Sequence, residues 1–286
     1  MKDYCEEDVG NILLLEHVNL QVPDQSVATL FYVVGLGLTR DPYLNVGLEN
    51  MWINMGEQQF HLPTRAPQVI HGRIGLVVPN LETLEQRLAL LGERLQNTRF
   101  GWMKAADHID VTCPWGNNIR CHPSGSASFG DMALGLAYVE FLVAAGAALS
   151  IGRFYERVLG AAFSVTDDPS GLAARVKIGR NQALIFRESG ATSAYDGHHI
   201  AIYIGNFSRP YGLLKERGLV TEDVRNHQFR FQDVIDIEDG RRIFQLEHEV
   251  RSLHHPMYGR FFVNRDGHQT QRNYRRGRDA LVPFSD

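Results

Sequence analysis

Three segments with alternating apolar residues carry histidine, glutamate and tyrosine on their polar side. In HHIAIYIGN the isoleucines share one face of a predicted β-strand, so His199 and Tyr203 share the other. The same alternation in RRIFQLEHEVRS sets Glu247 opposite its apolar residues, and in AYVEFLV it sets Tyr138 and Glu140 opposite the valines. These side chains are the candidates for chemistry.

A neutral imidazole with one or two carboxylates on rigid strands can hold a divalent metal ion and leave coordination positions open. Two neighbouring oxygens of a substrate can chelate the ion there, and the metal then stabilises the negative charge that develops. His199 and Glu247 are the pair that strand parity places on one face. The alternative for each is structural: a histidine satisfied within an apolar strand, and a glutamate paired at a strand end.

The strands that position these residues belong to an internal repeat. Four alternating segments recur about every sixty residues: EHVNLQVPD, GRIGLVVPN, AYVEFLVAA and HHIAIYIGN. Each is followed by a stretch with helical spacing of apolar residues and then by further strand-like segments. Every unit therefore reads as a strand, a helix and two or three strands.

The chain also divides into two halves. The predicted first and third helices share an echo, FYVVGLG and FYERVLG, as expected from a duplication. The run PSGSASFGDMALG separates them and has the composition of a linker. We therefore predict two domains, residues 1–125 and 126–286, each with two units.

Four such units in tandem resemble the vicinal oxygen chelate superfamily, which contains glyoxalases, bleomycin-resistance proteins and extradiol dioxygenases. The resemblance covers nearly the whole chain. It implies an α+β fold of four βαβββ modules in two curled-sheet domains, and a small-molecule substrate. It also implies a divalent ion (Fe, Mn, Ni or Zn), held by His199, Glu247 and, as third ligand, Glu140. Tyr138, Tyr203 or His227 would then handle protons or orient the substrate.

The resemblance leaves several readings open. The protein could be a ring-cleaving extradiol-type dioxygenase, or a metal-free binding protein in which Trp52 and Trp102 enclose an apolar ligand. His227 could equally be a structural histidine at a strand edge. A second metal site is also open, formed by three histidines of the N-terminal half: His17, His61 and His122.

The segment after Glu249 is rich in histidine, tyrosine and arginine. It is expected to form either a lid over the cavity or a strap that seals it or contacts another subunit, since Pro256 prevents the strand from continuing. As a lid it would let Arg251 or Arg260 clamp a substrate carboxylate.

Composition excludes other classes of function. The 286 residues have a net charge of -4, which gives no broad positive field for nucleic acid. Three unpatterned cysteines argue against a disulfide framework, and the sequence lacks a signal peptide and a membrane span. GxSxG, HExxH and P-loop motifs are absent. We expect a cytoplasmic protein; its association into a homo-oligomer and its use of glutathione are left open.

Overall fold

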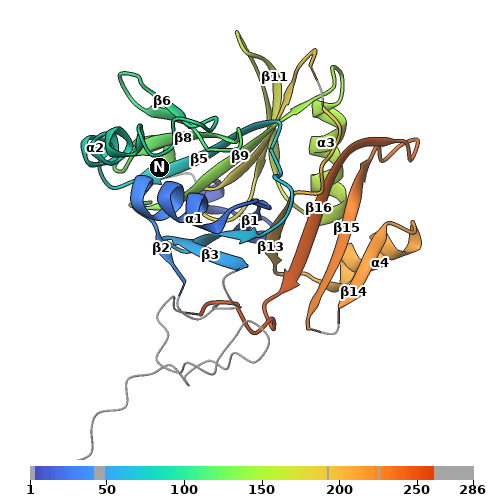
Figure 1. Ribbon diagram of the computed structural model, residues 1–286. Helices are drawn as coiled ribbons and strands as arrows, with labels where there is room; N and C mark the ends of the chain where they lie inside the picture. Colours follow the sequence, from blue (N-terminus) through green and yellow to red (C-terminus); the bar gives the residue numbers. More distant parts are fainter. Residues whose placement is uncertain (1–3, 42–48, 192, 225, 261–286) are drawn as a thin grey trace, which may run out of the picture.

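The computed structural model describes residues 4–41, 49–191, 193–224 and 226–260 (Figure 1). Its main elements form four modules, each a strand followed by a helix and three more strands. Short 3-10 helices η1 (Tyr4–Glu7) and η3 (Ala127–Phe129) lie outside the modules.

Modules one and two make up the N-terminal half. Module one contains β1 (Ile12–Asn19), α1 (Gln25–Ala28), the π-helix η2 (Thr29–Gly35), β2 (Thr39–Arg40), β3 (Asn50–Met55) and β4 (Gln58–Pro63). Module two contains β5 (Gly72–Val78), α2 (Leu81–Leu91), β6 (Gly101–Lys104), β7 (Ile109–Thr112) and β8 (Asn118–Pro123). The residue that follows each opening strand and its proline, Asp24 or Asn80, caps the helix with its side chain.

Modules three and four make up the C-terminal half. Module three contains β9 (Gly135–Val143), α3 (Ala148–Phe154), the π-helix η4 (Tyr155–Leu159), β10 (Phe163–Asp168), β11 (Gly171–Lys177) and β12 (Ala183–Glu188). Module four contains β13 (His199–Ile204), α4 (Ser208–Glu216), β14 (Val220–Val224), β15 (Gln228–Ile235) and β16 (Arg242–Ser252).

The modules pair across the two halves of the chain. The first sheet has the order β14-β15-β16-β13-β1-β4-β3-β2 and joins module four to module one. The second sheet has the order β10-β11-β12-β9-β5-β8-β7-β6 and joins module three to module two. In each sheet the two opening strands meet as antiparallel neighbours at the centre, and each is parallel to the last strand of its own module.

The helices lie between the two sheets. Helix α3 packs against β11 of the second sheet and β15 of the first, and Figure 1 shows it between β11 and β16. The buried apolar residues of both sheets and of the helices form one main core. Each sheet therefore has one face against the helices and one helix-free face, and side chains alternate between the two.

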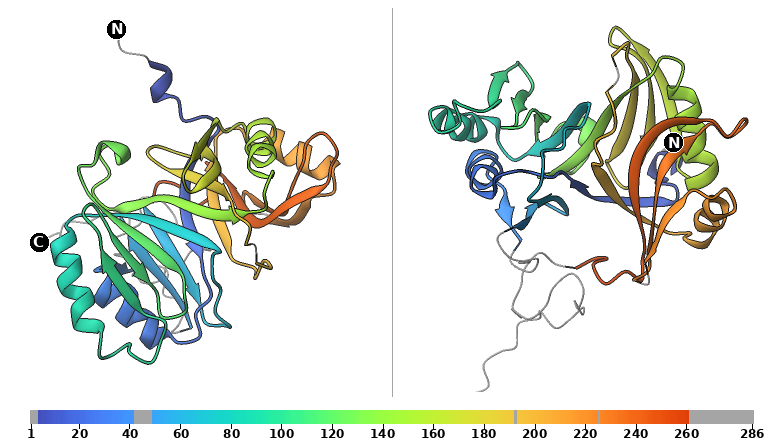
Figure 2. Two further views of the ribbon diagram at one scale, coloured as in Figure 1. Left: turned by 90° about the horizontal axis from the view of Figure 1, so that it is seen from above. Right: turned by 45° about the vertical axis from the view of Figure 1, so that its right-hand side comes forward.

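The predicted α+β fold of four βαβββ modules in two sheets is confirmed. Figure 2 shows the N-terminal half, blue to green, beside the C-terminal half, yellow to orange. Each sheet, however, takes one module from each half, so the two modules of a half do not share a sheet. The division at residue 125 stays a prediction.

Candidate metal centre

The helix-free face of the first sheet gathers polar side chains from its central strands. His17 and Asn19 of β1 lie opposite Ala201 and His199 of β13, and Asn19 also pairs in register with His61 of β4. These side chains are largely buried although no helix covers this face. The segment after β16 crosses it: the ring of Tyr258 lies 5.0 Å from that of Tyr203.

Three imidazoles converge at the centre of this face. His17, His61 and His199 each offer a ring nitrogen, and these nitrogens lie within 4.8 Å of one another. Nε2 of His17 and Nε2 of His199 are buried and have no hydrogen-bond partner among the described residues. Buried polar atoms are nearly always satisfied, so two unsatisfied nitrogens within one group of imidazoles are unusual.

A β-bulge orients His17. The register between β1 and β13 shifts between Leu15 and His17, which makes Glu16 the extra residue. The Glu16 Oε2 atom consequently lies 2.5 Å from His17 Nδ1. A carboxylate on Nδ1 holds the proton there and leaves the lone pair on Nε2, the arrangement common behind metal-bound histidines.

The other two imidazoles are kept neutral. Burial, with the neighbouring His17, holds the pKa values of His61 and His199 well below their usual range. A neutral imidazole is the form that binds metal. His61 Nδ1 accepts from the Asn19 amide at 3.0 Å and Nε2 donates to Asn50 Oδ1 at 2.6 Å, so His61 has to release one of these partners to ligate.

Two glutamates of β16 adjoin the imidazoles. Glu247 Oε1 lies 3.5 Å from His199 Nδ1, and Glu249 Oε2 lies 3.8 Å from His199 Nε2, the unpartnered nitrogen. Arg230 holds both carboxylates, each at 2.6 Å. Burial opposes the ionisation of Glu249, but Arg251 and Arg230 outweigh it and lower its pKa below the ordinary value.

Arg251 ties this group together. It donates to Glu249 Oε1 at 2.6 Å and to Glu16 Oε2 at 2.8 Å, and all three side chains are at least 94% buried. Burial alone would raise the pKa of Glu16, yet Arg251 and His17 lower it to about 2. The carboxylates therefore stay ionised beside the imidazoles.

The repeat reveals which glutamate is equivalent to His61. His17 lies opposite Ala201 and His199 lies opposite Asn19, so the central strands are related by a pseudo-twofold axis that exchanges His17 with His199. Asn19 pairs with His61, and its equivalent Ala201 pairs with Glu249. Glu249 thus occupies the position of His61 in the other module, whereas Glu247 matches Gln59, the partner of His17.

Two aromatic side chains complete this face. The Trp52 indole stacks on the His61 ring at 3.9 Å between centroids and meets His17 edge-on at 4.9 Å. Its Nε1 donor is buried without a hydrogen-bond partner in the described part of the chain. Tyr203 OH lies 3.4 Å from Arg251 Nη1, so this predicted residue touches the arginine that holds Glu249.

The structure places two predicted site residues in the other sheet. Glu140 lies on β9 and pairs with Arg187 at 3.2 Å, and Tyr138, also on β9, bonds His122 at 3.1 Å. The prediction that Glu140 completes a site with His199 and Glu247 is not supported by this arrangement. The reason is the module pairing, which carries β9 into the second sheet.

The same pairing separates the predicted N-terminal histidine set. His17 and His61 join His199, while His122 lies on β8 in the second sheet. The equivalent positions of that sheet carry the non-ligating residues Arg73, Tyr138, Arg120 and Ile185. His227 is exposed, has a left-handed backbone (φ 63°) in the β14–β15 turn, and lies beside His254 instead of the imidazole group.

The proposed substrate clamps are already paired within the protein. Arg251 binds Glu16 and Glu249, and Arg260 binds Asp41 at 2.6 Å. Arg260 ties the segment after β16 to the first module, in agreement with a strap. Residues 261–286, which include the remainder of this segment, lie outside the described residues.

Sequence reasoning missed the roles of Glu16, Trp52 and Glu249. The signal for Glu249 was available, because the repeat aligns its strand with that of His61. Glu16 depends on a bulge and Trp52 on strand pairing, neither of which alternation alone predicts.

Comparisons with known proteins support the fold. No protein-family model and no curated protein matches the sequence. The structure is similar to a putative dioxygenase from Bacillus subtilis, with a TM-score of 0.58 and 15% identity over 92% of this chain and 89% of the other. It is also similar to glyoxalase I from Zea mays, with a TM-score of 0.58 and 14% identity over 87% of this chain and 94% of the other.

Among the described residues, no helix has the length and apolarity needed to cross a bilayer. Four βαβββ modules, two eight-stranded sheets and these structural neighbours together establish the architecture. The chain has the vicinal oxygen chelate fold.

Proposed function

We propose that the protein is a metal-dependent enzyme in which His17, His61, His199 and Glu249 hold a divalent ion. The observation that carries the proposal is the group of three imidazoles whose ring nitrogens lie within 4.8 Å of one another, together with the buried, unpartnered Nε2 atoms of His17 and His199. The structural neighbours add that this fold is shared with glyoxalase I.

The donor set fits such an ion. Imidazole nitrogen and carboxylate oxygen suit zinc, iron, nickel and manganese. Bonds of about 2.0–2.1 Å in a tetrahedral site place two nitrogens roughly 3.4 Å apart. The imidazole nitrogens, now within 4.8 Å of one another, need to approach by up to about 1.4 Å through side-chain rotations.

The surrounding residues prepare the ligands. Glu16 keeps the proton of His17 on Nδ1, and Arg251 with Arg230 fixes the carboxylate of Glu249. Because two arginines lower its basicity, Glu249 suits the role of ligand better than that of proton acceptor. Glu247 is a quarter exposed, pairs with Arg230 but not with Arg251, and lies beside His199, so we assign it the role of receiving a substrate proton.

The substrate class follows from the open positions. When bound, the ion would polarise two neighbouring oxygens of a small molecule and stabilise the negative charge formed on them. The buried Nε1–H of Trp52 is the donor available to one of those oxygens. We infer that the substrate is a small molecule. We also propose that the enzyme is cytoplasmic.

A dioxygenase is the second candidate. His17, His199 and Glu249 form a two-histidine, one-carboxylate set, which in general suits non-haem iron(II). Iron-loaded protein that produces a coloured ring-cleavage product from a catechol under oxygen would favour this reaction. The absence of such a product, with metal still bound, would favour a lyase or isomerase.

The test of the proposal is metal content after mild purification. We expect about one ion per chain in the wild type and loss of that ion in His17→Ala, His199→Ala and Glu249→Gln. The matched control is His122→Ala, which removes an imidazole from the second sheet and should leave the ion in place.

A further comparison separates the two glutamates. Glu247→Gln should retain the ion and lose activity, whereas Glu249→Gln should lose both. Wild-type protein without metal, and without thermal stabilisation by added iron, nickel, manganese or zinc, would contradict the proposal and favour a metal-free binding protein.

A further inference from the structure

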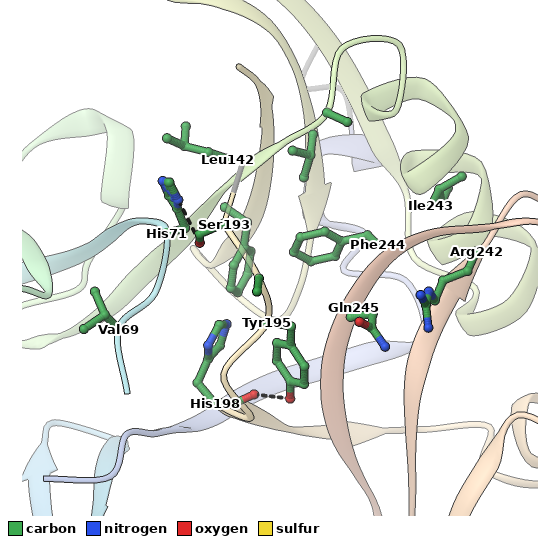
Figure 3. Close-up of a pocket in the computed structure, with 14 residues that line it drawn as sticks. Val69, His71, Leu142, Ser193, Tyr195, His198, Arg242, Ile243, Phe244 and Gln245 are labelled. Atoms are coloured by element: carbon green, nitrogen blue, oxygen red, sulfur yellow. Dashed lines mark hydrogen bonds between the residues drawn. The ribbon is translucent and has the colours of Figure 1, made fainter. Parts of the chain in front are cut away.

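The structure assigns a second ligand site to a cavity at the junction of the two sheets, for a one-ring aromatic compound that carries a hydroxyl group. The cavity has a volume of about 270 Å³. Its walls come from the start of β16, the end of β9 and the segments that precede β5 and β13 (Figure 3). It takes no residue from the imidazole group.

The cavity and the candidate metal centre are neighbours at the start of β13. His198, which lines the cavity, directly precedes His199, which belongs to the metal centre. The His198 ring stacks on Phe141, whereas His199 adjoins Glu247 and Glu249, so the two side chains serve different sites. The proposal therefore does not depend on the metal.

His198 supplies an unsatisfied acceptor. Its Nδ1 lies 2.7 Å from Asp196 Oδ1, and Asp196 also accepts the backbone N–H groups of His198 and Val69. In the neutral ring, donation from Nδ1 to Asp196 leaves the lone pair on Nε2. Nε2 has no partner among the described residues, and the side chain is 93% buried.

The lone pair on Nε2 of His198 requires a hydrogen-bond donor from the ligand. A hydroxyl group of a bound molecule would satisfy Nε2 when the ring turns to present this nitrogen to the cavity, whereas a purely apolar molecule would leave it bare.

The walls fit an aromatic ring. Phe141, Phe244 and Tyr195 line the cavity, and Phe141 stacks parallel to the His198 ring at 6.0 Å. A cavity of about 150 Å³ lined by apolar side chains accepts benzene, so about 270 Å³ admits one substituted ring. Figure 3 shows Tyr195 and Phe244 between His198 on one side and Arg242 on the other.

Arg242 adds a preference for an anionic substituent. Its side chain is 58% exposed at the rim, and its nearest carboxylate in the described part of the chain, Asp233, is 3.9 Å away. A ring with a hydroxyl at one end and a carboxylate at the other would meet His198 inside and Arg242 at the opening. We expect the carboxylate to contribute little, since its partner is exposed.

The experiment is calorimetric titration of the full chain with 4-hydroxybenzoate, phenol and benzoate. 4-Hydroxybenzoate should bind most tightly. His198→Asn should weaken 4-hydroxybenzoate and phenol about tenfold, the value of one buried hydrogen bond, and benzoate less than threefold. Arg242→Ala should weaken 4-hydroxybenzoate about threefold and leave phenol unchanged.

Matched variants serve as controls. His108→Asn breaks an equivalent histidine–aspartate pair, with Asp107 at 2.7 Å, outside the cavity, and should bind all three probes as the wild type does. Ala194→Phe fills the cavity from its rim and should abolish binding even if His198→Asn does not fold. His199→Ala should bind the probes normally, which separates this site from the metal centre.

Absence of binding of 4-hydroxybenzoate and phenol to the wild type would overturn the assignment. So would equal weakening of benzoate and phenol by His198→Asn, because the hydroxyl would then not meet His198. Binding that survives Ala194→Phe would place the probes elsewhere.

Discussion

Replacing Arg251 by methionine tests how the buried charges around the candidate metal centre are balanced. Arg251 hydrogen-bonds Glu16 at 2.8 Å and Glu249 at 2.6 Å, and at most 6% of any of the three side chains is exposed. Methionine keeps most of the side-chain volume and removes the charge. The two carboxylates then lose their shared cation.

The expected cost follows from what each carboxylate keeps. Glu249 retains Arg230 at 2.6 Å, and Glu16 retains His17 Nδ1 at 2.5 Å, so neither is stranded completely. Removing one partner of a buried ion pair costs about 3–5 kcal/mol, and we expect Arg251→Met to lower the free energy of unfolding by about 3 kcal/mol.

The assay is urea unfolding at neutral pH, in EDTA, followed by circular dichroism and fluorescence. Arg157→Met is the control, because Arg157 pairs with Glu238 at 3.3 Å while both side chains are more than half exposed. It should change the free energy of unfolding by about 0–1 kcal/mol. Equal changes in the free energy of unfolding for Arg251→Met and Arg157→Met would refute the claim that Arg251, Glu16 and Glu249 depend on one another.

Two further predictions concern the second sheet. Gly75→Ala would place a Cβ atom 2.2 Å from the ring of Tyr138, so it should lower the free energy of unfolding by about 1–3 kcal/mol. The control is Gly101→Ala, because nothing lies within 4 Å of a Cβ atom there, and it should lower the free energy of unfolding by less. Equal decreases in the two variants would contradict the close packing of Gly75 against Tyr138. Burial and Arg120 lower the pKa of His122 to about 4, below the roughly 6.5 of the unfolded chain. Its contribution to stability is thus complete above pH 6.5 and is lost as the pH falls towards 4. An NMR titration of the ring that gave an ordinary pKa would refute this environment.

Much of the fold could be predicted from the sequence. Alternating apolar residues and the sixty-residue repeat predict four units of a strand, a helix and two or three strands, and the resemblance makes them βαβββ modules. Strand parity correctly predicts that His199 and Glu247 share a face. These features are local, and alternation is set by the pleat of a single strand.

The partners of His199 could not be predicted from local pattern. Which opening strand meets β13 is decided by packing between modules far apart in the chain, and β1 meets it there. His17 and His61 therefore reach His199, while Glu140 and Tyr138 do not. The sequence does contain one unused clue: His17 and His199 hold equivalent places in the repeat, and no other module has histidine there.

The central claim is most directly tested by anomalous diffraction at the metal absorption edge, from crystals of the metal-loaded protein. The account predicts one strong peak at about 2.0–2.3 Å from Nε2 of His17, Nε2 of His199, a ring nitrogen of His61 and a carboxylate oxygen of Glu249. A peak on the second sheet, or none between these side chains, would contradict it.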